Sequence, residues 1–538
     1  HALETHGMKI VETDLGEYII QLRNERPSHI ITPAVHLRRQ EVGQLFHEKL
    51  NVPYTEDIPT MTNTARKVLR KVFLNADVGI SGVNFGVAET GGICIVTNEG
   101  NGRMVTSLPP IHIALMGIER LVRDLDDLPL MLSLLPRSAT GQKLTVYTQI
   151  IHQPLPHQQR HIILIDNGRT KLRNSPLKES LLCIRCGACM NACPVFREIG
   201  GHAYNSVYPG PIGSVISAGL FGSDFVPLAQ ASSLCGACKD ACPVDIDLPK
   251  LLTRVRAGES PSPDGRGAMG EGKNRLSITS KIFLRIYSRV ATHPKLFTLS
   301  QKLASFGTRL ISPFSDFVRL PAFTGWGSSK DLPKFARKTF RERFMVSDSL
   351  MSKPEIFPSK ITSQKTEYLR EQATAIHTTD QFVEELIKVN GQVIRTSDED
   401  LTIKVIEFLK SRSIDHVHFA PNMLDEDMFQ KAGIDVSHER DAEITAGVTK
   451  ALCGLADTGS ILEADGEGGK LFASLLPEIH LAILHEANII PSLEGAIHLT
   501  RETRSAVFIT GPSRTGDIEM SHTIGVHGPG EVVVFLVS

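Results

Sequence analysis

The sequence predicts an α/β protein in which two copies of one domain flank a small cysteine-rich module. Three observations carry this prediction. Seven of the nine cysteines gather in two short runs, the regions on either side repeat one another, and each repeat alternates β-branched runs with amphipathic stretches. With 538 residues, the chain is long enough for about three or four domains.

The two cysteine runs are separated by about 41 residues and both end in Cys-Pro. Thiolates at three-residue steps wrap an iron–sulfur cluster, and the cysteine before the proline ligates the other cluster in two-cluster ferredoxins. The long separation predicts the α-helical type of two-cluster module. We therefore expect two iron–sulfur clusters, with Cys183, Cys186, Cys189 and Cys242 holding cluster 1 and Cys193, Cys235 and Cys238 holding cluster 2.

Cluster 2 lacks a fourth cysteine. When the two runs are superimposed, Cys183 falls on Ser232. A serine hydroxyl is a harder ligand than a thiolate and a poor substitute for it in iron–sulfur coordination. We expect cluster 2 to be a [3Fe–4S] cluster, or a [4Fe–4S] cluster whose fourth iron takes Ser232, water or another group.

Paired Cys-x-x-Cys motifs also make structural zinc sites, which is the main alternative. Zinc takes closed sets of four ligands, and seven cysteines in a four-plus-three pattern fit that poorly. Disulfides are disfavoured because the chain is large, shows no secretory signal and spaces its cysteines as metal ligands. A reducing compartment, the cytoplasm, is expected.

Charge and hydropathy give no support to two classes of function, nucleic-acid binding and membrane spanning. The 58 Lys+Arg residues balance 59 Asp+Glu residues, so nothing favours a nucleic-acid partner. No apolar run approaches the roughly eighteen residues that span a bilayer. The chain opens at His1 in a stretch that reads as domain interior, which predicts that the first domain is N-terminally incomplete.

The repeat relates residues 89–114 to residues 457–482 at a constant offset of 368, with ten identities in 26 positions. Both copies are predicted to form parallel sheets with helices on both faces, because short buried-strand patterns alternate with helical ones. The helix candidate is Asp400–Ser411. The strand candidates are Ile30–Thr32, Ile93–Thr97, Ile162–Ile165 and Val532–Val537.

These features divide the chain into four predicted parts: an α/β domain over 1–172, the cysteine-rich module over 173–260, a linker and basic segment over 261–360, and a second α/β domain over 361–538. The basic segment carries sixteen Lys/Arg against four Asp/Glu between Arg266 and Arg343. It could dock an acidic partner or associate peripherally with an anionic membrane. We favour an ordinary amphipathic helical segment packed over the module, because charged faces are usually only solvated.

Polar residues at equivalent positions of the repeat are the candidates for catalysis: Glu89 and Asp457, and His112 and His480. A His–carboxylate pair could abstract a proton from a hydroxy acid. We favour the alternative that the histidines satisfy buried backbone groups and the acids cap helices, because position in a repeat is set first by the fold. Gly265–Gly270 matches G-x-G-x-x-G only within a linker, so no flavin or NAD site is evident.

Residues 1–345 resemble the iron–sulfur protein of bacterial lactate utilisation (LutB type), and residues from about 361 resemble its smaller companion (LutC type). Both repeats are similar to the LUD domain, whose fold resembles the isomerase/CoA-transferase class. The two proteins are usually separate chains, so they appear fused here. The matching stretches are Val11–Tyr18, Cys183–Cys189, Gly201–Tyr204, Tyr208–Gly213, Ser233–Cys238, Leu455–Ser460 and Gly511–Asp517.

The resemblance implies an iron–sulfur electron-transfer component of a complex that oxidises L-lactate to pyruvate. Such a chain would be an oxidoreductase subunit of an L-lactate dehydrogenase complex, with a further iron–sulfur subunit (LutA type) and an electron acceptor as partners. The main alternative is a ligase- or transferase-type enzyme on the LUD domains, with a structural or sensing iron–sulfur module. Cluster reduction by L-lactate only in the presence of a partner subunit would favour the first.

Overall fold

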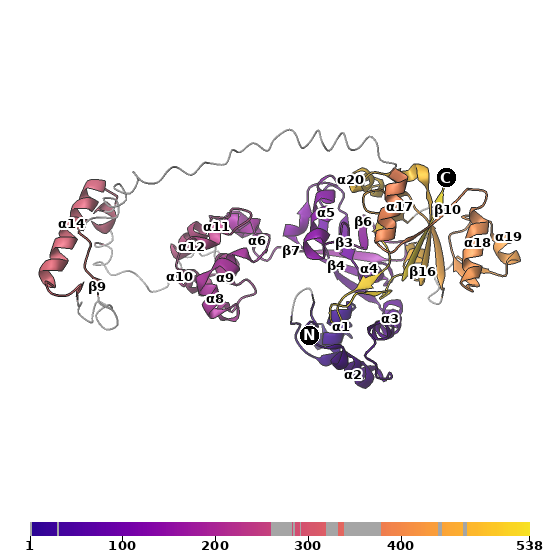
Figure 1. The fold of residues 1–538 in the computed structure, drawn as a ribbon, viewed down its shortest axis with the longest axis horizontal. Coiled ribbons are helices and arrows are strands. Elements are labelled where there is room, and N and C mark those ends of the chain that lie inside the picture. The colour runs from indigo at the N-terminus through magenta and orange to yellow at the C-terminus, as the bar shows by residue number, and fades with distance from the viewer. Residues whose placement is uncertain are drawn as a thin grey trace. The chain divides into compact units, whose positions relative to one another are not determined.

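The computed structural model describes residues 3–28, 32–259, 282, 286–290, 292–318, 332–337, 378–438, 444–465 and 471–538 (Figure 1). The chain divides into two compact units. Unit 1 comprises His1–Thr170 together with Leu369–Ser538, and unit 2 comprises Lys171–Tyr368. Both copies of the repeat therefore belong to one unit, and unit 2 is inserted between them in the chain.

An eight-stranded sheet joins the two copies. Each copy contributes four strands, and the order of the four in one copy mirrors the order in the other. The two halves meet where β6 (Tyr147–Ile151) pairs antiparallel with β18 (Ser505–Ile509). The full order is β17 (Ile489–Ile490), β14 (Cys453–Leu455), β15 (Ser460–Ala464), β18, β6, β3 (Ile93–Thr97), β2 (Phe85–Val87) and β5 (Leu121–Val122).

Each copy also has a parallel sheet. In the first copy, three strands pair in the order β1 (Val78–Gly82), β4 (Ile111–Gly117) and β7 (Gln159–Ile165). In the second copy, six strands pair in the order β10 (Gln392–Thr396), β21 (Glu531–Val537), β16 (Ile479–His485), β13 (Ala446–Lys450), β11 (His416–His418) and β12 (Asp435–Ser437). Parallel sheets were predicted for both copies, whereas the shared mixed sheet was not.

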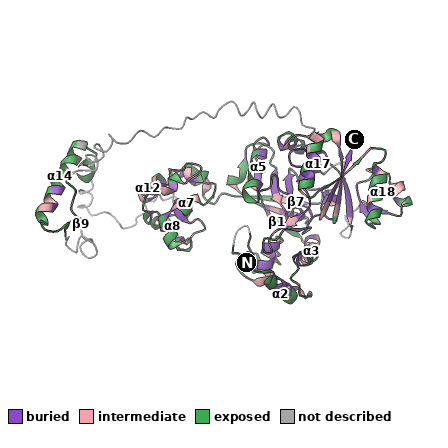
Figure 2. Cartoon of the chain, in the orientation of Figure 1, coloured by how far each residue is buried: buried purple, intermediate pink, exposed green. Residues whose placement is uncertain are grey.

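The sheet of the second copy is covered on both faces, as parallel sheets usually are. Helices α18 (Leu401–Ser411) and α19 (Glu426–Lys431) pack on one face. Helix α17 (Thr378–Lys388) and the shared sheet pack on the other. Figure 2 shows buried residues concentrated in these sheets.

The corresponding face of the first copy is open among the described residues. Val78 and Ile80 are 41% exposed, and Ile163 and Ile165 are 47% and 43% exposed. The prediction that Ile162–Ile165 form a buried strand is therefore wrong about burial, because β7 lies at a sheet edge and no described helix covers its outer face. Ile30 and Ile31, in another predicted strand, lie outside the described residues.

Three helices precede the first copy: α1 (Leu15–Arg23), α2 (Arg39–Leu50) and α3 (Ile58–Asn75). Asp14 caps α1 by accepting a hydrogen bond from the Gly16 N–H, and Asn24 ends it in the left-handed conformation. Apolar residues at helical spacing form the buried face of α3, among them Met61, Ala65 and Leu69. Three further helices complete unit 1: α4 (Asn101–Ser107), α5 (Asp127–Ala139) and α20 (Leu493–Ala496).

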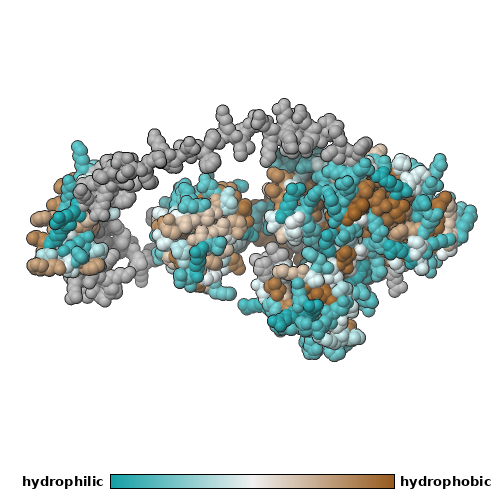
Figure 3. Space-filling model, viewed as in Figure 1, coloured by the Kyte–Doolittle hydropathy of each residue, from teal (hydrophilic) through white to brown (hydrophobic). Residues whose placement is uncertain are grey.

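The regular elements described in unit 2 are mostly helices. The longest, α14 (Pro294–Ile311), carries an exposed apolar stripe that includes Leu303 and Phe306 (Figure 3). No helix among the described residues is long and apolar enough to cross a membrane. The shorter helices, beginning at the boundary between the units, are α6 (Arg169–Arg173), α7 (Ala188–Ala192), α8 (Pro194–Ile199), α9 (Gly210–Phe221), α10 (Val226–Gln230), α11 (Ala237–Asp240) and α12 (Leu248–Arg256).

Candidate functional site

The two cysteine runs of unit 2 fold into loops of the same shape. Arg185 and Leu234 occupy equivalent places in the two runs and both have positive φ, at 60° and 54°. Gly187 and Gly236, two residues further on, are also left-handed and each precedes a short helix. A non-glycine residue with positive φ is strained and usually marks a constrained loop. Both loops are therefore wound tightly around their cysteines.

The thiols of each loop lie close enough to influence one another. Burial raises the pKa of Cys189, and the neighbouring Cys183 and Cys186 raise it further. Burial also raises the pKa of Cys238 to about 11, with contributions from Cys189, Cys193 and Cys235.

Cys193 of the first run thus lies beside Cys238 of the second. Cys242 of the second run packs against the same core as Cys183 and Cys189. Cys189 of the first run also lies beside Cys238, and Cys238 belongs to the same core, so the division of the seven cysteines between two clusters stays a prediction.

Backbone donors point at the sulfurs, as an anionic iron–sulfur cluster requires. The N–H of Arg185 donates to Cys183 Sγ at 3.3 Å, and that of Phe196 donates to Cys193 Sγ at 3.5 Å. Among the described residues, no three thiols lie within 4.8 Å of one another. Four thiolates around one zinc at 2.3 Å would be only about 3.8 Å apart. The loops therefore fit a cluster better than a single zinc ion.

Ser232 takes the place that Cys183 has in the other loop. Its Oγ accepts a hydrogen bond from the Leu234 N–H at 3.2 Å, just as Cys183 Sγ accepts one from the equivalent Arg185 N–H. The serine oxygen thus occupies the position in the second loop that Cys183 Sγ occupies in the first.

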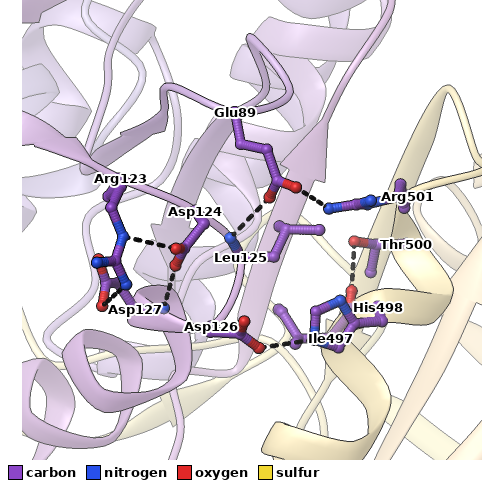
Figure 4. Close-up of polar contacts among 10 residues, drawn as sticks. All are labelled: Glu89, Arg123, Asp124, Leu125, Asp126, Asp127, Ile497, His498, Thr500 and Arg501. Carbon is purple, nitrogen blue, oxygen red and sulfur yellow. Dashed lines mark hydrogen bonds and ion pairs between the residues drawn. The ribbon is translucent and has the colours of Figure 1, made fainter.

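In the first copy of unit 1, the catalytic candidates Glu89 and His112 have different partners. The buried His112 ring contacts Ser81 Oγ at 2.9 Å, and Arg160 Nε donates to its Nδ1 at 3.0 Å. Burial and the Arg160 charge lower the pKa of His112 to about 3. Glu89 is exposed and forms an ion pair with Arg501 of the second copy (Figure 4). The structure does not bring these two candidates together.

In the second copy, the buried His480 pairs with a carboxylate other than the predicted one. Its Nε2 lies 2.9 Å from Glu463 Oε1 and 2.8 Å from Thr449 Oγ1. Burial raises the pKa of Glu463, but its contacts with His480, Thr449 and Ser474 together outweigh burial and the net shift is downward. Asp457 is half-buried, and burial raises its pKa. Glu463 has no counterpart in the first copy, where Ile95 occupies its position.

Sequence reasoning missed a cluster of three carboxylates in unit 1. Ligand oxygens of Asp14, Glu99 and Asp517 lie within 4.8 Å of one another. The sequence marks each residue only separately. Asp14 and Asp517 lie in two of the stretches that carry the family resemblance, and Glu99 lies in the repeat. Only the fold shows that these three stretches meet.

Comparison with known proteins identifies the domains. The model of the LUD domain matches residues 2–168 and 379–537, and that of the 4Fe-4S dicluster domain matches residues 179–246. The model of the C-terminal part of lactate utilisation protein B matches residues 253–346. The predicted boundaries at 172, 260 and 360 stay predictions.

These matches and the cysteine loops define a LUD-domain protein with an iron–sulfur module. A lactate utilization protein B of Bacillus cytotoxicus is 41% identical over 353 residues, which cover 64% of this chain and 72% of the relative. One from Bacillus cereus is 40% identical over the same shares. The chain therefore belongs to the LUD-domain family that includes lactate utilization protein B, as its sequence resemblance predicted.

One solved structure is also similar, that of a duf162 family protein from Deinococcus radiodurans. It is 16% identical, and the match covers 30% of this chain and 96% of that one, with a TM-score of 0.23. This score is too low to indicate a shared fold.

Proposed function

We propose that the chain is the iron–sulfur electron-transfer component of a complex that oxidises L-lactate to pyruvate. The observation that carries the proposal is that the two cysteine runs meet, since Cys189 and Cys193 of the first run both lie beside Cys238 of the second. In two-cluster ferredoxins each run gives one cysteine to the other cluster, so the runs of such a module must lie close together. The names of the relatives, which refer to lactate utilization, support the choice of substrate.

The proposed ligands are Cys183, Cys186, Cys189 and Cys242 for cluster 1 and Cys193, Cys235 and Cys238 for cluster 2, in a helical two-cluster module. When bound, two adjacent clusters would relay electrons one at a time. The chain's own residues favour this role in two ways. Backbone N–H groups donate to the sulfurs of Cys183 and Cys193, which stabilises negative charge there. The Phe196 and Tyr204 rings, 5.9 Å apart, lie beside Cys193 and limit access of water.

Lactate oxidation releases two electrons, so a centre that splits the pair must act before a single-electron relay. The proposal therefore includes a further iron–sulfur subunit and an electron acceptor as partners. Because the two LUD copies are joined in one chain, they would be present in the complex in a fixed ratio.

The first test is to purify the full chain anaerobically and measure its iron, zinc and acid-labile sulfide, with EPR spectra before and after reduction. About seven or eight irons per chain are expected. The Cys238→Ser variant should lose the iron of cluster 2. Cys453→Ser, which changes a buried cysteine outside the module, is the matched control and should lose none. Zinc without sulfide would contradict the proposal.

The second test adds L-lactate and follows the bleaching of the visible cluster absorption. Bleaching should require the partner subunit, because the chain alone is proposed only to carry electrons. Rapid bleaching without the partner would place lactate oxidation on this chain. No bleaching with the partner present would exclude the relay.

A further inference from the structure

Three carboxylates from distant parts of the chain converge in unit 1. Asp14 precedes α1, Glu99 follows β3, and Asp517 follows β19 (Arg514–Thr515). One oxygen of each lies within 4.8 Å of the other two. A fourth carboxyl, Glu17, hydrogen-bonds to Asp14 from the first turn of α1. So many acidic groups in one place need a compensating charge or protons.

Burial makes this need acute. Glu99 is only 5% exposed, so little water can stabilise a charge on it. The nearby cation Arg66 does not pair with the carboxylates, since its Nη1 donates to the Gly525 and Gly528 carbonyls at 2.9 and 2.6 Å.

A buried histidine is aimed into the same cluster. His527 is 1% exposed, and its Nε2 lies 3.5 Å from Glu99 Oε2 without a hydrogen-bond partner. The backbone carbonyl of Thr13 accepts a hydrogen bond from the ring, and Nε2 is the ring nitrogen left without a partner. The ring proton therefore belongs to the other nitrogen, and Nε2 presents a lone pair to the carboxylates. Two lone pairs facing each other call for a cation between them.

We propose that Asp14, Glu99, Asp517 and His527 bind a divalent first-row transition-metal ion. Three carboxylate oxygens and one imidazole nitrogen are the ligand set that Mn²⁺, Fe²⁺ and Zn²⁺ accept, whereas Mg²⁺ and Ca²⁺ prefer oxygen alone. The site is separate from the cysteine loops, which belong to unit 2.

Hydrogen bonds hold each carboxylate while leaving it an oxygen for the metal. The Gly16 N–H donates to Asp14 Oδ1 at 3.1 Å, and the Leu15 N–H donates to Glu99 Oε2 at 3.2 Å. The Thr515 hydroxyl donates to Asp517 Oδ2 at 2.8 Å. Glu99 Oε1 is buried and has no hydrogen-bond partner. Such outer contacts orient ligands in established metal sites.

The test is an Mn²⁺ titration of the full chain with its iron–sulfur clusters loaded, followed by the EPR signal of free Mn²⁺. Mn²⁺ is chosen because it competes weakly for thiolate sites. One Mn²⁺ per chain is expected. Asp517→Asn should weaken binding at least tenfold, and His527→Gln should remove the ¹⁴N coupling from the pulsed EPR spectrum of the bound ion.

Glu519→Gln is the matched control, because Glu519 is an exposed acid in the same loop whose partner is Arg39. It should bind Mn²⁺ like the parent chain. Thermal unfolding with and without Mn²⁺ adds an independent readout, since the ion should raise the midpoint of the parent and of Glu519→Gln but not of Asp517→Asn. If the folded parent binds no Mn²⁺, or if Asp517→Asn binds it equally well, the proposal is overturned and shared protons hold the carboxylates together.

Discussion

At the scale of single residues, Ser232 is where the second cysteine loop departs from the ligand pattern of the first. Its Oγ receives the same backbone hydrogen bond that Cys183 Sγ receives in the first loop. Replacing this oxygen by sulfur should therefore create a fourth soft ligand without rearranging the loop.

We predict that Ser232→Cys raises the iron content from about seven to about eight per chain and removes the EPR signal of the oxidised state. Iron analysis and EPR of the anaerobically purified variant check this. Ser223→Cys, an exposed serine outside the loops, is the control and should leave both unchanged. About seven irons in both the parent and Ser232→Cys would show that Ser232 does not face the cluster, whereas about eight in both would mean that Ser232 or another group already completes it.

His112 predicts a specific dependence of stability on pH. Its pKa is lowered from 6.5 to about 3 in the folded protein by burial and Arg160. Between these values the unfolded chain binds a proton that the folded chain does not, so stability falls as the pH falls below 6.5. The contribution of this one group is about 1.4 kcal/mol per pH unit.

We expect His112→Gln to reduce the slope of unfolding free energy against pH by that amount between pH 6 and pH 5. Urea unfolding at both pH values measures it. Between pH 8 and pH 9 the ring is neutral in both states, and the two proteins should then have equal slopes. Equal slopes between pH 6 and pH 5 as well would show that His112 is not buried and neutral.

The residues of the two candidate sites differ in how far the sequence predicts them. The two cysteine loops can be predicted from spacing, because the cysteines of each loop are close in the chain, whereas the exchange of Cys193 and Cys242 between clusters stays a prediction. The carboxylate cluster cannot be predicted from spacing, since Leu15 and Glu99, which hydrogen-bond in it, are 84 residues apart. The partner of His480 was also missed. Glu463 lies in β15 and is buried beside His480. The prediction instead chose Asp457, because it lies in the turn that the two copies share.

At the scale of elements, β7 shows what a hydrophobic run can and cannot predict. The run Ile162–Ile165 is a strand, as predicted, but its burial depends on whether another element covers it. The equivalent strand of the second copy, β21, is covered by α18 and α19. Similar hydrophobic runs are therefore exposed in the first copy and buried in the second.

These two strands provide a matched pair of substitutions. Ile163→Lys should change the unfolding free energy by no more than about 0.5 kcal/mol, because the side chain is exposed. It should also reduce binding of a hydrophobic dye and self-association. Phe535→Lys, at the equivalent buried position, should cost at least about 4 kcal/mol. Urea unfolding and light scattering measure both, and a similar cost at the two positions would contradict the described exposure of β7.

At the scale of the whole molecule, the shared eight-stranded sheet makes the two LUD copies one structural unit. The repeat in the sequence predicted two copies of a domain, but neither hydropathy nor spacing indicates that β6 and β18 pair. Whether strands from different copies pair depends on how their edges fit together, and no local sequence pattern indicates this.

A proline in the seam should therefore affect both copies. Ala506→Pro removes the β18 N–H that faces Ile150 of β6 and is expected to destabilise unit 1 by at least about 3 kcal/mol. Hydrogen exchange should lose protection in β3 of the first copy as well as in β15 of the second. Leu251→Ala, in the core of unit 2, is the control and should leave protection of both strands unchanged. Loss confined to β15 would mean that the copies open independently.

The seam between β6 and β18 also sets an order of events during synthesis. Gln149 of β6 and Ser505 of β18 hydrogen-bond across 356 residues of chain. A ribosome that adds about 5–20 residues per second completes β18 tens of seconds after β6 has emerged. Throughout that interval, β6 presents an unpaired edge, which is a template for aggregation unless a chaperone shields it. The iron–sulfur module is meanwhile free to fold and load, since it is translated in between and belongs to the other unit.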